Sequence, residues 1–391
     1  MPSAWRRVGI GAAALVGVYA IILGALLTPN LQRFALYAHK INTLFLHDID
    51  NGERFGFAKG QVTPFSIHTA DGETLYAWHV LPIDAYARNE EVLRKEAGSI
   101  GDFSNTHAFH LLTSSEAKVV VSFHGNAGHI AQGWRPETLR HLTAQPNTHV
   151  VTIDYRGFGK SSGYPTEAGL IEDGTALVNW VLRIANIPPN QIAILGQSLG
   201  TAVASAVALR FADPSNELVW PNAAEPIPGV VEKDGLQPTI FAGIILIAPF
   251  SSLPSLLLTY RMGGFLPLLL PLRPFPALAS SLTSQMVDKW HTAERLRAYH
   301  ATLSGDSGLA PANAARLGSL QIFHSLDDFD ISYHQTEMIC RRIFVDGAEC
   351  IDGSKGAAVL GVKSDDAPRV RFELLQHGGE TKSHVIRPSI H

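Results

Sequence analysis

The chain has 391 residues, enough for one large domain with a sizeable buried core. Its formal net charge of −4 provides no basic field for nucleic acid, and only 17% of its residues are charged, which favours a membrane-linked protein. Two cysteines exclude a disulfide-rich scaffold and a thiolate zinc cluster. The 17 histidines form no HExxH motif or tight ligand cluster, so we expect no metal and no cofactor. The sequence identifies no protein partner.

Residues 8–27 form an uncharged apolar run, preceded by Arg6 and Arg7 and ended by Thr28 and Pro29. A helix of this length spans roughly 30 Å, the thickness of the hydrocarbon core. A cleavable signal peptide has a shorter apolar core of about 7–15 residues and a small-x-small cleavage site, so we favour an uncleaved anchor. A buried core helix would show a polar face. The positive-inside rule favours a cytosolic N-terminus, with the body in a lumen or outside.

The sequence divides into a tail and anchor at 1–29, a connecting segment at 30–59 and a domain at 60–391. Residues 61–68 and 74–81 predict an opening hairpin that turns at Asp71-Gly72. Helices are expected at 167–184 and 199–211. Continuous apolar runs between helices indicate parallel strands covered on both faces, and hence an α/β protein. Six such runs occur, at 118–123, 149–154, 191–195, 243–247, 320–324 and 370–375.

Three stretches interrupt this alternation. Residues 84–116 are polar and predict a surface insertion, and 213–238 predict a loop excursion rich in proline and acidic residues. Residues 253–290 are apolar and rich in proline, which predicts a cap. Cys340 and Cys350 are close enough in sequence to form a bridge in an oxidising compartment, or they are two free buried thiols; both alternatives stay open.

The strongest motif is G-x-S-x-G at Gly196 to Gly200, directly after an apolar strand and before a helix-forming stretch. Strand, tight turn and helix are the context of a nucleophile elbow, in which the flanking glycines leave room for the turn. We therefore predict Ser198 as the nucleophile of a serine hydrolase.

A second motif, HGNAG at His124 to Gly128, follows the strand predicted at 118–123. In such enzymes this loop supplies one backbone N–H donor to the oxyanion, and the residue after the nucleophile supplies the other. We predict the backbone N–H groups of Asn126 and Leu199 as these donors.

The acid and base of a triad should follow later strands in the order Ser, Asp, His. After the strand at 320–324, an acid four residues beyond the strand-end histidine is Asp328, with Asp327 as runner-up. After the last strand, His384 lies a loop's length away and is favoured as the base. His377 is the runner-up because it sits almost at the strand end.

Together the anchor, HGNAG, DYRGFGKSSG, GQSLGTAVA, IAPFSS and HSLDD resemble the alpha/beta hydrolase domain-containing protein twelve family over about residues 61–384. The resemblance implies an alpha/beta-hydrolase fold, with a mostly parallel eight-stranded sheet flanked by helices and a hydrophobic cap at about 253–290. It implies a membrane-anchored serine lipase for monoacylglycerols or lysophospholipids, notably lysophosphatidylserine, in the endoplasmic reticulum with a lumenal active site. The family's motif positions fall on Ser198, Asp328 and His384.

The sequence thus favours a serine hydrolase that cleaves carboxylic esters of single-chain lipids, with a lipid ester as substrate and the bilayer as its surroundings. The apolar cap could line an acyl tunnel or contact the bilayer surface, or could simply pack on its own core. Two alternatives remain. One is a serine peptidase or acyl-protein thioesterase on the same fold, and the other is an inactive membrane scaffold.

Overall fold

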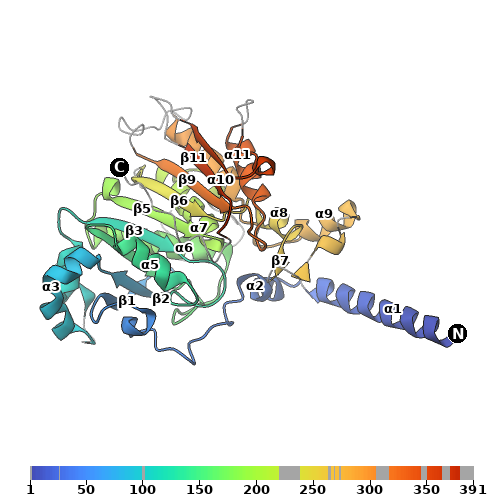
Figure 1. Cartoon of the computed structure of the whole chain (residues 1–391), viewed down its shortest axis with the longest axis horizontal. Coiled ribbons are helices and arrows are strands. Elements are labelled where there is room, and N and C mark those ends of the chain that lie inside the picture. The colour runs from blue at the N-terminus through green and yellow to red at the C-terminus, as the bar shows by residue number, and fades with distance from the viewer. Residues whose placement is uncertain are drawn as a thin grey trace.

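The fold is known from a computed structural model, which describes residues 2–25, 27–98, 102–219, 238–262, 266–267, 269–272, 274–304, 317–344, 350–362 and 370–378. A nine-stranded sheet in the order β1-β2-β4-β3-β5-β6-β9-β11-β10 forms its centre, with helices on both faces (Figure 1). The strands are β1 (Val62–His68), β2 (Thr74–Val80), β3 (Lys118–Phe123), β4 (Thr148–Ile153), β5 (Ile192–Gln197), β6 (Gly243–Ile247), β9 (Ser319–Ser325), β10 (Ala358–Val362) and β11 (Val370–Leu375).

The sheet is mixed but mostly parallel. β1 and β2 form the predicted hairpin, and β2 also pairs with β4 in the antiparallel sense. From β4 to β11 every neighbouring pair is parallel. The carboxyl ends of these strands therefore lie along one edge, where ligands of open α/β sheets bind.

The prediction of eight strands was one short. β10 pairs antiparallel with β11 at the end of the sheet. Its sequence, AVLGV, contains a glycine, and Val359 is exposed. An edge strand is held mainly by main-chain hydrogen bonds to one neighbour. It does not need a continuous run of buried residues, which is the pattern that predicts a strand from the sequence.

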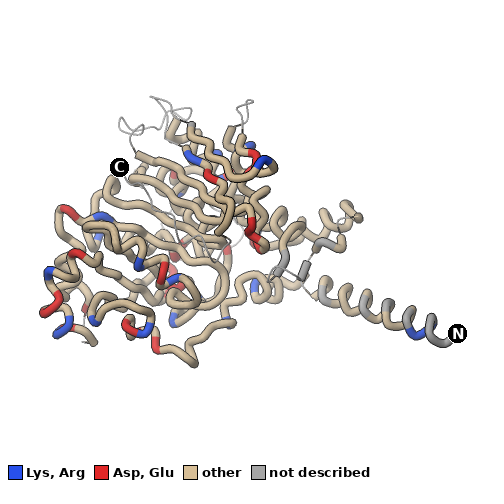
Figure 2. The backbone as a smooth tube through the Cα atoms, viewed as in Figure 1, with Lys and Arg blue, Asp and Glu red and all other residues tan. Residues whose placement is uncertain are grey.

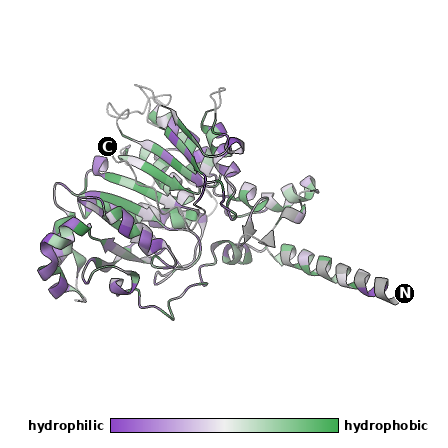
Figure 3. Ribbon diagram, viewed as in Figure 1, coloured by the Kyte–Doolittle hydropathy of each residue, from purple (hydrophilic) through white to green (hydrophobic). Residues whose placement is uncertain are grey.

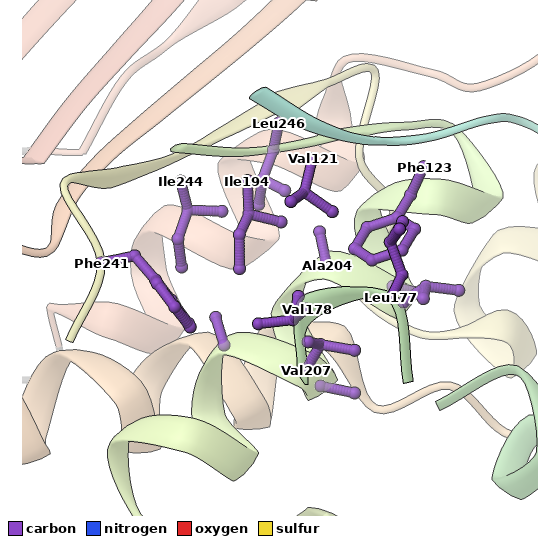
Figure 4. Packing of buried hydrophobic residues seen from close by; sticks show 14 of the residues in the cluster. Val121, Phe123, Leu177, Val178, Ile194, Ala204, Val207, Phe241, Ile244 and Leu246 are labelled. Atoms are coloured by element: carbon purple, nitrogen blue, oxygen red, sulfur yellow. The ribbon is translucent and has the colours of Figure 1, made fainter. Parts of the chain in front are cut away.

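The core lies in two layers, one on each face of the sheet. Val121 and Ile194 point toward α6 (Glu167–Arg183) and α7 (Leu199–Ala212), the two helices predicted beside the sheet (Figure 4). Val120 and Leu195, one residue away along the same strands, belong to the second cluster under α5 (Arg135–Thr143). This alternation follows from the two-residue period of a strand and explains why the parallel strands are apolar throughout.

Residues 84–116 are more than a polar surface insertion. They contain α3 (Ile83–Glu96) and α4 (His107–Leu112), joined through a turn that buries Phe103. The Phe103 ring stacks on Phe65 of β1 at 4.7 Å and on Trp180 of α6 at 5.8 Å between ring centroids. α3 is rich in charged residues (Figure 2), and the residues that it buries are Ala85, Tyr86 and Leu93.

The N-terminus is a bent pair of helices, α1 (Pro2–Ala25) and α2 (Pro29–Tyr37), with α1 projecting from the body (Figure 1). No single helix of the described chain is both long and apolar enough to cross a membrane. The pair Gly9–Ala25 and Pro29–Tyr37, bent by 101°, has the length and composition to do so together, and a signal sequence has the same properties. The apolar run predicted as an anchor at 8–27 thus lies mostly in α1, which does not by itself pass as a membrane-spanning helix.

The cap extends over α1 and α2. It comprises α8 (Leu253–Leu257), the short strands β7 (Arg261–Met262) and β8 (Leu266–Pro267), and α9 (Pro276–Ser284). Its buried residues Leu269, Leu272 and Ala279 form a cluster against which Tyr19 and Leu23 of α1 pack. α9 carries no charged residue and is largely apolar (Figure 3). The cap and the N-terminal helix thus share one small apolar cluster.

Cys340 and Cys350 form a disulfide, which resolves the alternative that the sequence left open. The bond joins α11 (His334–Ile343) to the segment that precedes β10. On the other side of the same region, α10 (Thr292–Leu303) packs against α7 and α11.

Candidate active site

The predicted site residues follow the carboxyl ends of neighbouring strands. Ser198 follows β5, Asn126 lies in the loop after β3, Asp328 in the loop after β9, and His377 just beyond β11. β3 neighbours β5, and β6 and β9 follow β5 in the sheet. His384 lies outside the described residues.

Ser198 occupies a strained turn between β5 and α7. Its φ of 48° and ψ of −118° are rare for a residue with a side chain, and such strain occurs at functional sites. Its backbone N–H donates to the Ile247 carbonyl of β6 at 3.0 Å, which holds the turn on the sheet. The serine is buried, with 8% of its surface exposed.

The two glycines beside Ser198 are required by close backbone contacts. A Cβ at Gly196 would lie 2.3 Å from the Gly200 carbonyl oxygen, and one at Gly200 would lie 2.1 Å from the Phe123 carbonyl oxygen. Neither distance is possible without moving backbone. The second contact also shows that the start of α7 presses against the end of β3, so the elbow and the HGNAG loop are adjacent.

Arg135, at the start of α5, holds the HGNAG loop from one side. Its Nη2 donates to the carbonyl oxygens of Gly125, Asn126 and Ala127 at 3.0, 2.6 and 2.9 Å. Its Nη1 donates to the His129 carbonyl at 2.6 Å. In a trans peptide the C=O and the next N–H point in opposite directions. The Asn126 N–H is therefore directed away from the guanidinium.

The two predicted oxyanion donors are available. Over the part of the chain that is described, neither the Asn126 N–H nor the Leu199 N–H donates a hydrogen bond to protein. Leu199 is the first residue of α7, where an N–H has no intrahelical acceptor and carries the partial positive charge of the helix end. Two unused N–H groups beside a buried serine hydroxyl can stabilise a developing oxyanion.

Asp328 is the buried residue of a tight loop whose neighbour Phe329 is exposed. Its Oδ1 accepts from the backbone N–H groups of Asp330 and Ile331 at 3.0 and 2.9 Å. Its Oδ2 is 3.8 Å from Nε2 of the buried His324. His324 donates from Nε2 to the Ile331 carbonyl at 2.8 Å, and its Nδ1 accepts from the Thr336 hydroxyl at 2.7 Å. Burial lowers the pKa of His324 to about 4, so it stays neutral and serves as a brace for the loop.

The two runner-up residues contact one another. Nδ1 of His377 is 3.4 Å from Oδ2 of Asp327, and the backbone N–H of Gly378 donates to Asp327 Oδ1 at 2.9 Å. The His377 side chain is 81% exposed, whereas Asp328 is buried. Asp327 therefore ties the end of β11 to the loop after β9, and the pairing of Asp328 with His384 stays a prediction.

Asp154, in the DYRGFGKSSG motif after β4, is fully buried and joins two loops. Its Oδ1 accepts from the Ile130 N–H at 2.6 Å and its Oδ2 from the Lys160 N–H at 3.3 Å. Burial raises the pKa of Asp154 to about 7. It braces the segment after HGNAG.

The residues that sequence reasoning missed are the ones that hold the loops. Arg135 belongs to no motif and acts on main-chain carbonyls that folding brings near it. His324 served in the sequence only to locate Asp328, and its contacts with Ile331 and Thr336 appear only in the structure. Throughout the described ranges, no group of three or more His, Cys, Asp or Glu residues is placed to hold a metal ion. A cavity of about 790 Å³ lies elsewhere, between the segment at 48–53, β1 and α3, and no predicted site residue lines it.

Residues 119–353, more than half of the chain, match the model of the alpha/beta hydrolase family. The lysophosphatidylserine lipase ABHD12 of Danio rerio is 28% identical over 204 residues, which cover 51% of this chain and 48% of that protein. The uncharacterized protein YfhR of Escherichia coli K12 is 37% identical over 83 residues, or 21% of this chain and 28% of that protein. This chain thus spans about half the length of the ABHD12 relatives it matches.

The solved alpha-beta hydrolase of Vibrio vulnificus aligns with 90% of this chain and 87% of its own, at a TM-score of 0.54 and 12% identity. That likeness concerns the fold alone. The family match, the ABHD12 similarity expected from the motifs, and the elbow between β5 and α7 agree with one another. The chain belongs to the alpha/beta hydrolase family.

Proposed function

We propose that this protein is a membrane-anchored serine hydrolase that cleaves carboxylic esters of single-chain lipids, a lysophospholipid or a monoacylglycerol. The observation that carries the proposal is Ser198, held at positive φ beside two backbone N–H groups that donate to no protein group in the described chain. The similarity to lysophosphatidylserine lipase ABHD12 and the apolar cap support a lipid ester as the substrate.

The reaction runs through an acyl-enzyme. His384 takes the proton from the Ser198 hydroxyl, whose oxygen attacks the ester carbonyl carbon, and the oxyanion receives the N–H groups of Asn126 and Leu199. The intermediate collapses, and His384 gives its proton to the departing alcohol, the head-group side of the lipid. Water then attacks the acyl-enzyme by the same route and releases the fatty acid. Asp328 orients His384 and stabilises its cation. Each oxyanion donor is worth about 3–4 kcal/mol in comparable sites.

The catalytic body lies in the lumen of the endoplasmic reticulum, with the N-terminus in the cytosol. The disulfide between Cys340 and Cys350 supports an oxidising compartment. In intact microsomes, protease should remove an N-terminal tag and leave the body protected. Digestion of the body in intact vesicles would contradict this orientation.

The function is tested with a fluorophosphonate probe on membranes that contain the full chain. Wild type should be labelled and should hydrolyse lysophosphatidylserine or monoacylglycerol, whereas Ser198→Ala should do neither at an unchanged melting temperature. Equal turnover by purified Ser198→Ala protein would end the serine-hydrolase proposal. Turnover of peptides or acyl-proteins in place of lipid esters would replace the substrate class.

A further inference from the structure

The segment that links the N-terminal helix to the body lies beside the HGNAG loop. We call residues 29–43, which comprise α2 and the six residues after it, the N-terminal latch. Four hydrogen bonds join the latch, in the same chain order, to the four consecutive residues 126–129. They are Asn126 Nδ2 to the Leu36 carbonyl at 2.5 Å, Ala127 N–H to the Tyr37 carbonyl at 3.2 Å, Gly128 N–H to the Ile41 carbonyl at 3.0 Å, and His129 Nε2 with the Thr43 hydroxyl at 3.0 Å.

The loop needs such support because its conformation is unfavourable by itself. Ala127 and Gly128 have φ values of 57° and 70°, and a left-handed conformation is costly for alanine. The latch binds the N–H groups of these two residues, while Arg135 binds carbonyl oxygens of the loop on its own side. The loop is therefore held between α5 and the latch.

The latch is also fixed to the end of the cap. Arg33 Nε lies 3.1 Å from Asp288 Oδ2, and the Tyr37 hydroxyl donates to the same oxygen at 2.9 Å. The Trp290 indole N–H donates to the Tyr37 hydroxyl at 3.2 Å. All four side chains are buried. Tyr37 thus has its side chain in the cap and its main-chain carbonyl on the HGNAG loop.

We propose that the N-terminal latch is a positioning element of the oxyanion hole, which sets the Asn126 N–H through the bonds to Leu36, Tyr37, Ile41 and Thr43. This proposal rests on the proposed function, because it concerns the same oxyanion donor. The donor itself is a main-chain group, so the side chain of Asn126 acts only by holding the loop. An error of about 1 Å in such a donor is expected to cost on the order of 10²-fold in rate.

The test uses point variants of the full chain. Asn126→Ala keeps the N–H donor and removes the bond to Leu36, and Tyr37→Phe removes the link to Asp288. Both should lower kcat with little change in KM, Asn126→Ala by about 10-fold or more. Tyr86→Phe is the matched control. Tyr86 is a buried tyrosine of α3, at the β1 side of the sheet, and its hydroxyl donates one hydrogen bond to the Lys59 carbonyl at 2.9 Å. Loss of this bond should leave kcat and KM unchanged.

A transition-state analogue separates positioning from loss of structure. The inhibition constant of a trifluoromethyl ketone should rise in the two latch variants by the same factor by which kcat/KM falls, because the analogue's oxyanion uses the same N–H groups. Unchanged analogue affinity and unchanged kcat in Asn126→Ala would overturn the proposal.

Amide hydrogen exchange keeps the latch testable apart from activity. In both variants the amides of Ala127 and Gly128 should exchange faster than in wild type, while those of α3 stay unchanged. Unchanged exchange at these two amides in both variants would overturn the latch even in an active enzyme. A second outcome separates the latch from the proposed function. If wild type is neither labelled nor active but the amides of Ala127 and Gly128 exchange faster in the variants, the proposed function fails. The latch is then a structural clamp, and its role in positioning an oxyanion donor is overturned as well.

Discussion

Gly200 shows how a single atom decides the geometry of the elbow. Because Gly200 has no Cβ, the Phe123 carbonyl oxygen can approach the start of α7. A Cβ at this position would lie only 2.1 Å from that oxygen. The same contact brings the Leu199 N–H close to the HGNAG loop. The requirement at this position is one of space between two backbone segments, as a strained nucleophile turn demands.

Gly200→Ala should lower the free energy of unfolding by about 1–3 kcal/mol and strongly reduce ester hydrolysis, because backbone must shift to admit the methyl group. Gly361→Ala is the matched control, since no heavy atom lies within 4 Å of its Cβ position. Thermal unfolding and turnover measure both. A Gly200→Ala protein with wild-type melting temperature and rate would show that the elbow contact is wrong.

The acid and base are distinguished by four substitutions. His384→Ala and Asp328→Asn should each reduce turnover by about 10⁴-fold, as loss of a triad member does. His377→Ala and Asp327→Asn should cost at most a few-fold, because the His377 ring is 81% exposed and its partner ties two loops together. Steady-state kinetics on the purified variants decide it. An inactive His377→Ala beside an active His384→Ala would move the base to His377.

Among the elements, α11 links the loop after β9, which carries Asp328, to the disulfide. Thr336 of α11 donates to His324 Nδ1, and four residues later Cys340 is bonded to Cys350. The bridge closes a short stretch of chain that leads toward the edge strand β10. Since Cys340 is fully buried, both the cross-link and the packing of its sulfur contribute.

Reduction of this disulfide should destabilise the protein by about 2–4 kcal/mol, the usual range for a native bridge. The melting temperature of wild type should fall after the protein is unfolded and refolded in the presence of a thiol reductant. The double variant Cys340→Ser/Cys350→Ser should have this lowered melting temperature with or without reductant. Identical melting of wild type and the double variant would contradict a structural bridge.

At the scale of the whole molecule, buried histidines make the fold sensitive to acid. Burial lowers the pKa of His149 and of His324 to about 4, and that of His79 and His124 well below the usual 6.5. The unfolded chain therefore binds more protons than the native chain between pH 6.5 and 4. In this window stability falls as the pH falls.

Each such histidine should contribute a slope of about 1.4 kcal/mol per pH unit. Burial raises the pKa of Asp154 and of Asp173 to about 7 and also raises the pKa of Asp288, so the protonated forms of these three carboxyls are favoured in the folded state. They oppose the effect of the four histidines and reduce the net slope without reversing its sign. Urea unfolding at pH 7, 5.5 and 4.5 should show a steady loss of stability. His324→Gln should reduce the slope by the share of one histidine. A flat profile over this range would contradict neutral, buried imidazoles.

The elements whose patterns are local could be predicted from the amino-acid sequence. Six apolar runs and the two strands of the hairpin predicted eight strands that the structure contains, and α6, α7 and the G-x-S-x-G turn could be predicted because each depends on periodicity or on one tight turn. The edge strand β10 was missed although AVLGV is apolar, because the run is short and contains a glycine, which is disfavoured in strands. The disulfide stayed open for a similar reason, since ten residues of separation permit a bond without requiring it.

The groups that support the candidate site could be identified only from the folded chain. Arg135 binds four carbonyl oxygens, and Leu36 and Tyr37 meet the HGNAG loop about ninety residues later in the chain. These contacts engage main-chain groups, which every residue possesses, so no residue type at a fixed spacing announces them. Local patterns therefore predicted the position of Ser198, whereas the positions of its supporting loops depend on folding distant segments together.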